Sequence, residues 1–326
     1  MRRFVKPALL AAGLIIVFAL LLLWREAPNI KLPYGEQQGN RILIISPHPD
    51  DESIATTGVI SQSLNDGHEV KVVLLTYGDG FLKAAQKFTG KKDPAPDDYL
   101  RLGRTRRQET AWAMSLLGLC PGNITFLGYP DSALKILWDS QWDSENVKPA
   151  GSVNVDRVPY DDALNPGAPY SGQSAADTLA SIISDYQPTE IYYPDPSDDH
   201  PDHWAASAFV RYTLNSLNYD CNEHTYLVHR SLWPQPDMEE PAKPLLPPEE
   251  LLNIDTSWVD FALTKSEIES KKLALHQYVT QEAVMEPFLW AFIRSTELFG
   301  QNPDLVINES GTILKDPSSD TIGRLL

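Results

Sequence analysis

The chain has 326 residues, of which 42% are hydrophobic and 22% are charged, as expected for a globular protein with a sizeable core. Its formal net charge of −17 argues against a nucleic-acid partner, because phosphate binding needs clustered Lys and Arg. Two cysteines, Cys120 and Cys221, are too few for a cysteine-based zinc site or a disulfide framework. They fit two isolated small hydrophobic side chains better than one disulfide, and their pairing stays open.

Residues 1–25 predict a cytoplasmic stub and a membrane anchor. Basic residues lie before an uncharged apolar run of 17 residues, from Ala8 to Trp24. As a helix, this run would rise about 25 Å, at the short end of what crosses a bilayer. A cleaved signal peptide is the rival interpretation, but no small-residue cleavage site follows closely. The excess of positive charge before the run places the N-terminus in the cytoplasm and the remainder of the chain outside.

The elements that follow alternate between strand and helix. Residues 26–40 are a polar linker, residues 41–300 are the expected folded domain, and residues 301–326 are a C-terminal tail. The apolar patterns predict strands at 41–46, 70–76, 123–127, 190–193 and 226–228, and helices at 53–65, 99–119, 175–186, 204–217, 264–278 and 286–298. The long polar segments at 83–98, 139–172 and 234–250 are predicted loops. This order predicts an α/β, Rossmann-like fold with a mostly parallel sheet and helices on both faces.

Two acidic, histidine-bearing segments directly follow two of the predicted strands. Residues 48–52 come after the first strand, and residues 195–203 come after the fourth. In an open α/β sheet, ligands bind beyond the carboxyl ends of the strands. We therefore expect both segments to emerge at the same edge of the sheet.

These segments offer the donor atoms of a metal site. Zinc binds imidazole nitrogen and carboxylate oxygen, and a catalytic zinc usually keeps three protein ligands and one open position. Three of the chain's seven histidines, His48, His200 and His203, lie here. A single His-x-Asp at a strand end is usually a turn or a cap. Two such clusters at one sheet edge instead favour a metal site.

The same residues resemble a known family. Residues Pro47-His48-Pro49-Asp50-Asp51-Glu52 and His200-Pro201-Asp202-His203 resemble the PIG-L/LmbE-like family of zinc-dependent N-acetylglucosaminyl deacetylases. The resemblance extends over roughly residues 40 to 300. Weaker similarities occur in the expected order: Arg106-Arg107-Gln108-Glu109, Phe126-Leu127-Gly128-Tyr129-Pro130-Asp131, Tyr278-Val279-Thr280-Gln281 and Glu297-Leu298-Phe299-Gly300.

The resemblance implies a metal centre and a general base. His48, Asp51 and His203 would be the zinc ligands, and another divalent metal such as Fe²⁺ could replace zinc. Asp50 would take a proton from the attacking water. Zinc lowers the pKa of bound water to about 7, which makes hydroxide available at neutral pH.

The resemblance also implies residues for the leaving group and the sugar. His200 would stabilise the tetrahedral oxyanion or protonate the leaving amine, and Asp202 would orient His200. Arg106 and Asp131 would contact the sugar. Asp198 departs from the pattern, because some relatives have a Tyr two residues before the first His.

The expected reaction is hydrolysis of the N-acetyl group of an N-acetylglucosamine-type sugar, with release of acetate. A non-haem iron oxygenase is one alternative, because His48, Asp50 and His203 would also form a two-His-one-carboxylate site. Such oxygenases, however, use an all-β scaffold. A membrane-tethered sugar-binding module with a structural zinc is the other alternative, although structural zinc normally has four protein ligands and no open position. The sugar and the oligomeric state stay open.

Other features receive weaker interpretations. Residues 77–80 form a Gly-bearing turn that lacks a dinucleotide fingerprint, and we interpret it as a simple turn or a close backbone approach near the site. The insertions at 83–98 and 139–172 are expected to shape the acceptor end. Histidines expected to be ordinary surface or core residues are His68, His224, His276 and, least securely, His229. Aromatic residues that could stack on a sugar, with core packing as the alternative, are Trp138, Trp142, Trp204 and Tyr170.

Overall fold

The computed structural model describes residues 39–252, 256–301, 305–307 and 313–315. The described residues from Asn40 onward form one compact unit. The predicted anchor and most of the predicted linker lie outside the described residues, as does most of the predicted tail. Within the residues described, no helix is both long enough and apolar enough to cross a membrane.

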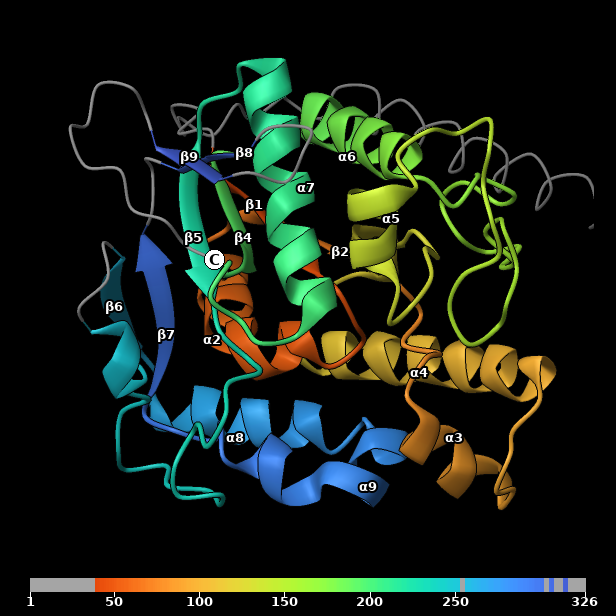
Figure 1. Ribbon diagram of the computed structural model, residues 1–326. Coiled ribbons are helices and arrows are strands. Elements are labelled where there is room, and N and C mark those ends of the chain that lie inside the picture. The colour runs from red at the N-terminus through yellow and green to blue at the C-terminus, as the bar shows by residue number, and fades with distance from the viewer. Residues whose placement is uncertain (1–38, 253–255, 302–304, 308–312, 316–326) are drawn as a thin grey trace, which may run out of the picture. The chain divides into compact units, whose positions relative to one another are not determined.

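A seven-stranded sheet lies at the centre of this unit, in the order β3-β2-β1-β4-β5-β7-β6 (Figure 1). Strands β1 to β5 pair in parallel, whereas β7 pairs antiparallel with both β5 and β6. The sheet is therefore mixed, with a parallel majority as predicted. The strands are β1 (Arg41–Ser46), β2 (Glu69–Leu74), β3 (Ile124–Phe126), β4 (Glu190–Pro194), β5 (Asn222–Tyr226), β6 (Ser257–Ala262) and β7 (Thr296–Gln301), with a separate antiparallel pair of β8 (Leu305–Ile307) and β9 (Ile313–Lys315).

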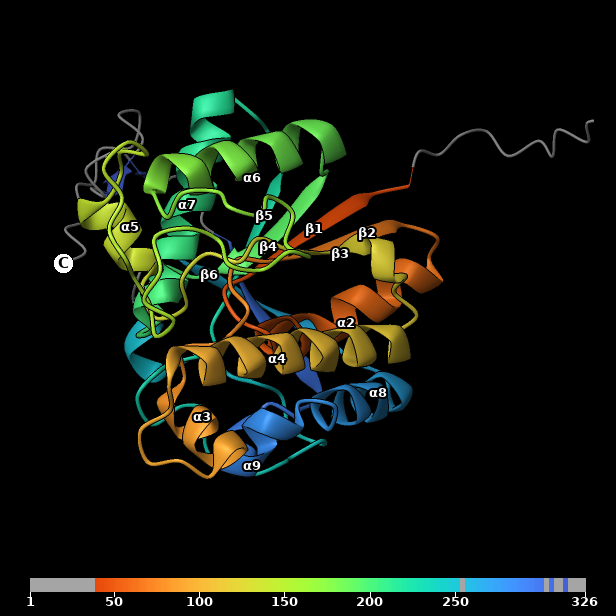
Figure 2. The same ribbon diagram turned by 90° about the vertical axis from the view of Figure 1, so that its right-hand side faces the viewer.

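Helices cover both faces of the sheet, as the sequence predicted. Helices α5, α6 and α7 lie on one face, and α2, α4 and α8 lie on the other (Figure 2). Helices α3 and α9 are side by side and form a further layer against α4 (Figures 1 and 2). The helices are α2 (Asp51–Asn65), α3 (Leu82–Thr89), α4 (Pro96–Leu116), α5 (Leu134–Ser140), α6 (Gly172–Tyr186), α7 (Pro201–Leu217), α8 (Lys265–Leu275) and α9 (Val279–Trp290), with 3-10 turns at Pro121–Asn123 and Glu249–Leu251.

Strand β1 is the buried centre of the sheet. Its residues 42–45 are all aliphatic and are at most 2% exposed, as expected for a parallel strand covered on both faces. The chain runs from β1 to β2 and β3 on one side, and to β4 and β5 on the other. The strand order thus reverses between β1 and β4, which is where open α/β sheets bind their ligands.

Three sequence predictions need correction, and two elements were missed. The predicted helix at 286–298 is wrong beyond Trp290, since residues 296–301 form β7, and β6 was not predicted at all. These strands owe their conformation to pairing with each other across the sequence, which local periodicity does not reveal. The predicted loop at 83–98 contains most of α3, and α5 was missed. The fifth strand, β5, spans Asn222–Tyr226. It starts four residues earlier than predicted, because its pairing with β4 begins at Asn222.

Candidate active site

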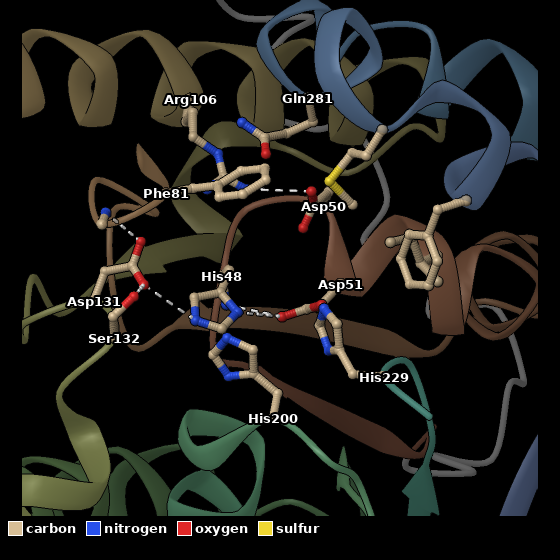
Figure 3. Close-up of a pocket in the computed structure, with 14 residues that line it drawn as sticks. His48, Asp50, Asp51, Phe81, Arg106, Asp131, Ser132, His200, His229 and Gln281 are labelled. Carbon is tan, nitrogen blue, oxygen red and sulfur yellow. Dashed lines mark hydrogen bonds and ion pairs between the residues drawn. The ribbon is translucent and has the colours of Figure 1, made fainter. Parts of the chain in front are cut away.

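The turn at residues 47–52 connects β1 to α2 and holds Asp50 in an unusual conformation. The backbone of Asp50 has φ 117° and ψ −33°, which is rare and costly for a residue with a side chain. The carboxylate of Glu52 accepts the N–H of Asp50 at 3.1 Å, and the Asp50 carbonyl accepts the N–H of Ile54 at 2.8 Å. These bonds hold the strained residue so that its side chain lines the pocket (Figure 3).

Glu52 itself lies beneath this turn, away from the pocket. It is fully buried, and the hydroxyl of Tyr278 donates a hydrogen bond to its carboxylate. Ser53 hydrogen-bonds to the same hydroxyl at 3.0 Å. Burial raises the pKa of Glu52 to about 7, while the hydrogen bond from Tyr278 opposes the rise. Glu52 is therefore a support for the turn rather than a wall of the pocket.

Asp51 lies between the two histidines predicted to share a metal with it. Its Oδ2 is 3.2 Å from Nδ1 of His48 and 3.1 Å from Nε2 of His203. The backbone N–H of His48 also donates to this oxygen at 2.9 Å. The structure thus brings together all three predicted ligands, from the turn after β1, from α2 and from α7.

The surroundings of His203 test whether a metal fits. Its side chain is fully buried, yet neither ring nitrogen has a well-formed hydrogen bond. The ring is flanked by Asp51 and by Asp198, whose Oδ2 is 3.2 Å from Nδ1. A buried imidazole without hydrogen bonds is rare in proteins, and a cation beside it would give its nitrogen a partner. The donor set therefore fits a divalent metal.

Electrostatics lead to the same conclusion. Burial disfavours the charged form of His203, but Asp198 and Asp51 outweigh it and raise the pKa to about 9. For His48, burial is again opposed by carboxylates, chiefly Asp131, and its pKa is raised well above the usual value. The rings of His203 and His48 thus hold a proton tightly, and a metal ion bound to these rings would displace it. Overlapping donor groups within 4.8 Å are His48, His200 and His203; Asp51, His203 and His229; and His48, Asp131 and Asp202.

Asp202 contacts a different histidine from the one expected. Its carboxylate accepts the N–H groups of Ser132 at 2.7 Å and Leu134 at 2.9 Å, and lies 3.3 Å from Nε2 of His48. Its link to His200 is made by the backbone, since the N–H of Asp202 donates to Nδ1 of His200 at 3.2 Å. This bond keeps the proton of a neutral His200 ring on Nε2.

Asp198 ties the second segment to the end of β5. Its carboxylate accepts the N–H groups of His200, Val228 and His229, each at 2.9 Å. This position, where some relatives have a Tyr, is thus buried and fully engaged. The same bonds bring His229 to the wall of the pocket. His229 was expected to be an ordinary histidine, and its place directly after the predicted strand at 226–228 was the one signal that could have singled it out.

Arg106 reaches from α4 to hold the first segment. It donates from Nη2 to the carbonyl of Pro49 at 2.5 Å and lies 3.2 Å from the carboxylate of Asp50 (Figure 3). It also donates from Nη1 to the carbonyl of Gly78 at 2.7 Å. A Cβ at Gly78 would lie 2.2 Å from this nitrogen, and the φ of Gly78 is +65°. The glycine turn at 77–80 is therefore a close backbone approach at the site.

Asp131 forms the opposite edge of the pocket. Its carboxylate accepts the N–H of Gly80 at 2.5 Å and lies 3.4 Å from Nε2 of His48. A Cβ at Gly80 would be 2.7 Å from Oγ of Ser132, so this glycine too permits close packing. Burial raises the pKa of Asp131, but His48 and Arg106 outweigh it and lower the pKa well below its usual value. Asp131 is thus ionised and faces the pocket.

These side chains surround a cavity of about 340 Å³, large enough for a small ligand. None of the four aromatic residues proposed to stack on a sugar lines this cavity. Trp138 packs edge-on against Trp142 and Trp204 in the core, and Tyr170 is only 2% exposed. The cavity is lined by His48, Asp50, Asp51, Ile54, Gly80, Phe81, Arg106, Asp131, Ser132, His200, His229, Gln281, Met285 and Phe288.

The insertions also lie elsewhere than expected. No residue of 83–98 or 139–172 is among those that line the cavity. Tyr160 of the second insertion stacks on Tyr77, with ring centroids 3.7 Å apart, and donates to Asp79 behind the site. This insertion therefore supports the pocket from behind. The two cysteines are both free.

Comparison with known proteins gives the family of the chain. Residues 43–214 match the profile of the PIG-L family, GlcNAc-PI de-N-acetylase. The chain belongs to the PIG-L family. The matched range includes both acidic histidine segments and Arg106 of α4. The PIG-L/LmbE-like resemblance seen in the sequence is thus confirmed.

Individual relatives are more distant. The chain is 27% identical over 180 residues to a 1D-myo-inositol 2-acetamido-2-deoxy-alpha-D-glucopyranoside deacetylase of Mycobacterium sp. (strain KMS), with 55% of this chain and 51% of the relative covered. It is 29% identical over 178 residues to the enzyme of that name from Rhodococcus opacus (strain B4), with 52% and 51% covered. The chain spans about half the length of the curated relatives it matches.

Solved structures share the fold of this PIG-L member. The zinc-inhibited form of teicoplanin deacetylase Orf2 superposes with a TM-score of 0.55 at 17% identity, covering 86% of this chain and all of that one. The antimicrobial reagent A40926 pseudoaglycone deacetylase Dbv21 gives 0.52 at 16% identity, with 81% and 97% covered. At such low identity these likenesses establish the α/β fold.

Proposed function

We propose that this PIG-L protein is a metal-dependent deacetylase that hydrolyses the N-acetyl group of an N-acetylglucosamine-type sugar, as part of a glycan, glycolipid or glycoconjugate. The observation that carries the proposal is that Asp50 faces the same pocket as His48 and Asp51, while His203 lies buried beside Asp51 and its ring nitrogens have no well-formed hydrogen bond. The relatives that match about half of the chain are named as deacetylases of an acetamido sugar.

We propose zinc as the metal, held by His48, Asp51 and His203, with Fe²⁺ as the alternative. When bound there, the metal would acidify water and polarise the amide carbonyl. Asp50 is placed to take the proton from the attacking water. Burial raises its pKa to about 8, with Arg106 opposing, so near neutral pH the group can both take up a proton and give it back.

His200 is placed to stabilise the oxyanion. Burial and the neighbouring histidines lower its pKa to about 3, so that its ring is neutral at neutral pH. The N–H of Asp202 bonded to Nδ1 keeps the ring proton on Nε2 as a hydrogen-bond donor. A neutral donor suits an oxyanion better than it suits protonation of the amine. The proton that Asp50 has taken is then available to the leaving nitrogen.

Arg106 and Asp131 are proposed to contact the sugar. Both line the pocket, and together they present donors and an ionised acceptor to sugar hydroxyls. Arg106 has a second task, because its guanidinium already binds Pro49 and Asp50. The non-haem oxygenase alternative has no support in this scaffold, whose sheet carries helices on both faces.

The test combines metal analysis with acetate release by the full chain in detergent. N-acetylated monosaccharides, oligosaccharides and glycolipids are offered with and without added zinc, and oxygen uptake is recorded in parallel. Acetate release that depends on the metal is the expected result. Zinc binding without acetate release from any substrate would instead favour the sugar-binding module, and oxygen uptake coupled to turnover would favour an oxygenase.

We further propose that residues 1–25 anchor the protein with its N-terminus in the cytoplasm and its catalytic domain outside. The apolar run and the basic residues before it support this placement. The test is extraction of membranes with alkaline carbonate, followed by protease treatment of intact spheroplasts. Release of the protein into the carbonate supernatant, or protection of the catalytic domain from protease, would contradict the placement.

A further inference from the structure

One surface segment carries a charge opposite to that of the chain. Residues 82–104 contain six basic and three acidic residues, whereas the whole chain has a net charge of −17. Asp93 and Asp97 are exposed, but Asp98 is buried and pairs with two of the basic residues. The six basic side chains are all exposed, and they are Lys83, Lys87, Lys91, Lys92, Arg101 and Arg104. The segment is therefore a cationic surface on an acidic protein.

Helix α3 presents two of these lysines to solvent. Its residues 84–85 are alanines that are buried against α4. At 100° per residue, Lys83 and Lys87 lie one turn apart on the side of the helix that faces away from these alanines. Neither lysine forms an ion pair with any residue that the structure describes. Both charges are thus free to attract an anionic partner.

Exposed apolar side chains lie among these lysines. Leu82 at the start of α3 is 48% exposed, and Phe88 near its end is 39% exposed. We call Leu82, Lys83, Lys87, Phe88 and Lys92 the α3 patch. Exposed Leu and Phe side chains mixed with lysines on one helix are typical of a helix that lies in a membrane interface.

The α3 patch begins at the edge of the pocket. Gly80 and Phe81 line the pocket, and Phe81 is the residue directly before α3. In the close-up, Phe81 lies beside Arg106 (Figure 3). Leu82 and Lys83 follow at once in the chain. A surface that binds the α3 patch therefore lies next to the pocket.

The mixture of charged and apolar side chains favours a lipid surface over a soluble polyanion. Anionic headgroups attract lysines, and exposed Leu and Phe side chains enter the boundary between headgroups and acyl chains. A soluble polyanion would use the lysines but would leave both apolar side chains in water. Anionic lipid also repels the acidic remainder of the chain, which orients the protein with residues 82–104 toward the lipid.

We propose that the α3 patch docks on an anionic lipid surface and holds the pocket next to that surface. The proposal goes beyond the deacetylase function and concerns residues that do not line the pocket. It does not depend on residues 1–25, since α3 makes the contact itself. Docking is reversible and weakens with salt, because salt screens the charge of the lysines.

The first experiment measures whether α3 meets lipid. The full chain is kept in dodecyl maltoside, which covers the apolar run at 8–24. Cys120→Ser and Cys221→Ser remove the two free thiols, and Leu82→Cys is labelled with an environment-sensitive fluorophore. Phosphatidylglycerol added to the micelles is expected to shift the emission to shorter wavelength and to raise it roughly twofold, whereas phosphatidylcholine does neither. In 1 M NaCl, where the Debye length is about 3 Å, the change should disappear.

A second label position and a soluble polymer are the controls. Leu116, near the end of α4, is 52% exposed and lies about 20 Å along that helix from Leu102, which packs against α3. A label on Leu116→Cys should not respond to phosphatidylglycerol. An equal response at both positions, or no response at Leu82→Cys, would overturn the proposal. A response to soluble dextran sulfate as large as that to phosphatidylglycerol would show that the partner is a polyanion rather than a lipid surface.

A matched pair of charge reversals tests the lysines. Lys83→Glu with Lys87→Glu is expected to abolish the response of the label at Leu82→Cys. Lys148→Glu with Lys265→Glu makes the same change of net charge on exposed lysines elsewhere and should keep the response. Circular dichroism shows whether both pairs fold. Equal losses in the two pairs would show that net charge alone matters, and the α3 patch would then be wrong.

Hydrolysis gives a separate measurement, which rests on the proposed function. The substrate is a lipid-linked N-acetylglucosamine in phosphatidylglycerol vesicles, and soluble N-acetylglucosamine is the reference. Lys83→Glu with Lys87→Glu is expected to raise the KM for the lipid-linked sugar about tenfold, with kcat and the hydrolysis of the soluble sugar unchanged. If no sugar is hydrolysed but the label responds, the proposed function fails and the docking stands. Hydrolysis of both sugars without a response of the label would overturn the docking alone.

Discussion

The guanidinium of Arg106 lies 3.2 Å from the carboxylate of Asp50 and donates to the carbonyl of Pro49 in the same turn. Both side chains are nearly fully buried, with residue exposures of 3% and 4%. One buried cation therefore holds the proposed general base in position and opposes the rise of its pKa on burial. Since Asp50 has a strained backbone, this contact helps to keep its carboxylate aimed at the pocket.

Removal of Arg106 should affect the chemistry itself. Arg106→Gln is expected to lower kcat/KM about 100-fold, as expected for loss of a preorganised charge. Because Arg106 lowers the pKa of Asp50, its loss should move the acidic limb of the pH–rate profile to higher pH. The control is Arg107→Gln, whose side chain pairs with Asp162 at the surface. An unshifted acidic limb in Arg106→Gln would contradict this role.

Removal of the proposed base and removal of a proposed metal ligand should have different effects on the amount of bound metal. Asp50→Ala is expected to keep most of its bound metal but to lose turnover by roughly 10²- to 10⁴-fold, the usual contribution of a general base. His203→Ala is expected to lose the metal, because Asp51 would keep only one of its two imidazole neighbours. Elemental analysis and amine release are measured on the same samples. Near-wild-type deacetylation by Asp50→Ala would show that another group is the base.

Two glycine variants can distinguish the effect of backbone strain from the effect of a contact with the site. Gly67 and Gly78 both have positive φ, +78° and +65°, but only Gly78 has neighbours within 4 Å of a Cβ. Both Gly→Ala variants should lose about 1 kcal/mol of unfolding free energy from the left-handed conformation. Gly78→Ala should in addition displace Arg106 and lose most activity. Urea unfolding and amine release test the pair, and equal activities would show that Arg106 adjusts without cost.

Asp79 should make stability depend on pH. Burial and the neighbouring Asp131 raise its pKa from 3.8 to about 7, although the hydrogen bond from Tyr160 opposes them. The folded state then binds this proton more tightly than the unfolded state, so stability is lost as pH rises from about 4 to 7.

Asp79→Asn removes this titration and keeps an acceptor for Tyr160. Relative to wild type, the variant should gain on the order of 2 kcal/mol of unfolding free energy between pH 5 and pH 8. Urea unfolding at both pH values is the measurement. A difference between variant and wild type that is the same at both pH values would show that Asp79 does not titrate in this range.

The candidate site was largely predictable because its key segments are local. A buried aliphatic run followed at once by a His-Pro-Asp-Asp-Glu segment specifies a strand end that carries donor atoms, and the second segment repeats this arrangement. Two neighbouring parallel strands then bring both segments to one edge. The family match confirmed the PIG-L/LmbE-like resemblance that these segments carry. Strands β6 and β7 were less predictable, since each is stabilised by pairing rather than by its own pattern.

The sequence by itself determined the α/β fold class and singled out the candidate donor residues, since apolar periodicity and motif spacing act over a few residues. Tertiary structure decided which of these residues touch. In the folded chain the carboxylate of Asp202 lies next to His48, and the hydrogen bond to Asp198 holds His229 at the pocket. Phe288 of α9 stacks on His229. These contacts join residues from 31 to 154 positions apart or depend on how helices pack on the sheet. Only the folded core fixes such distances.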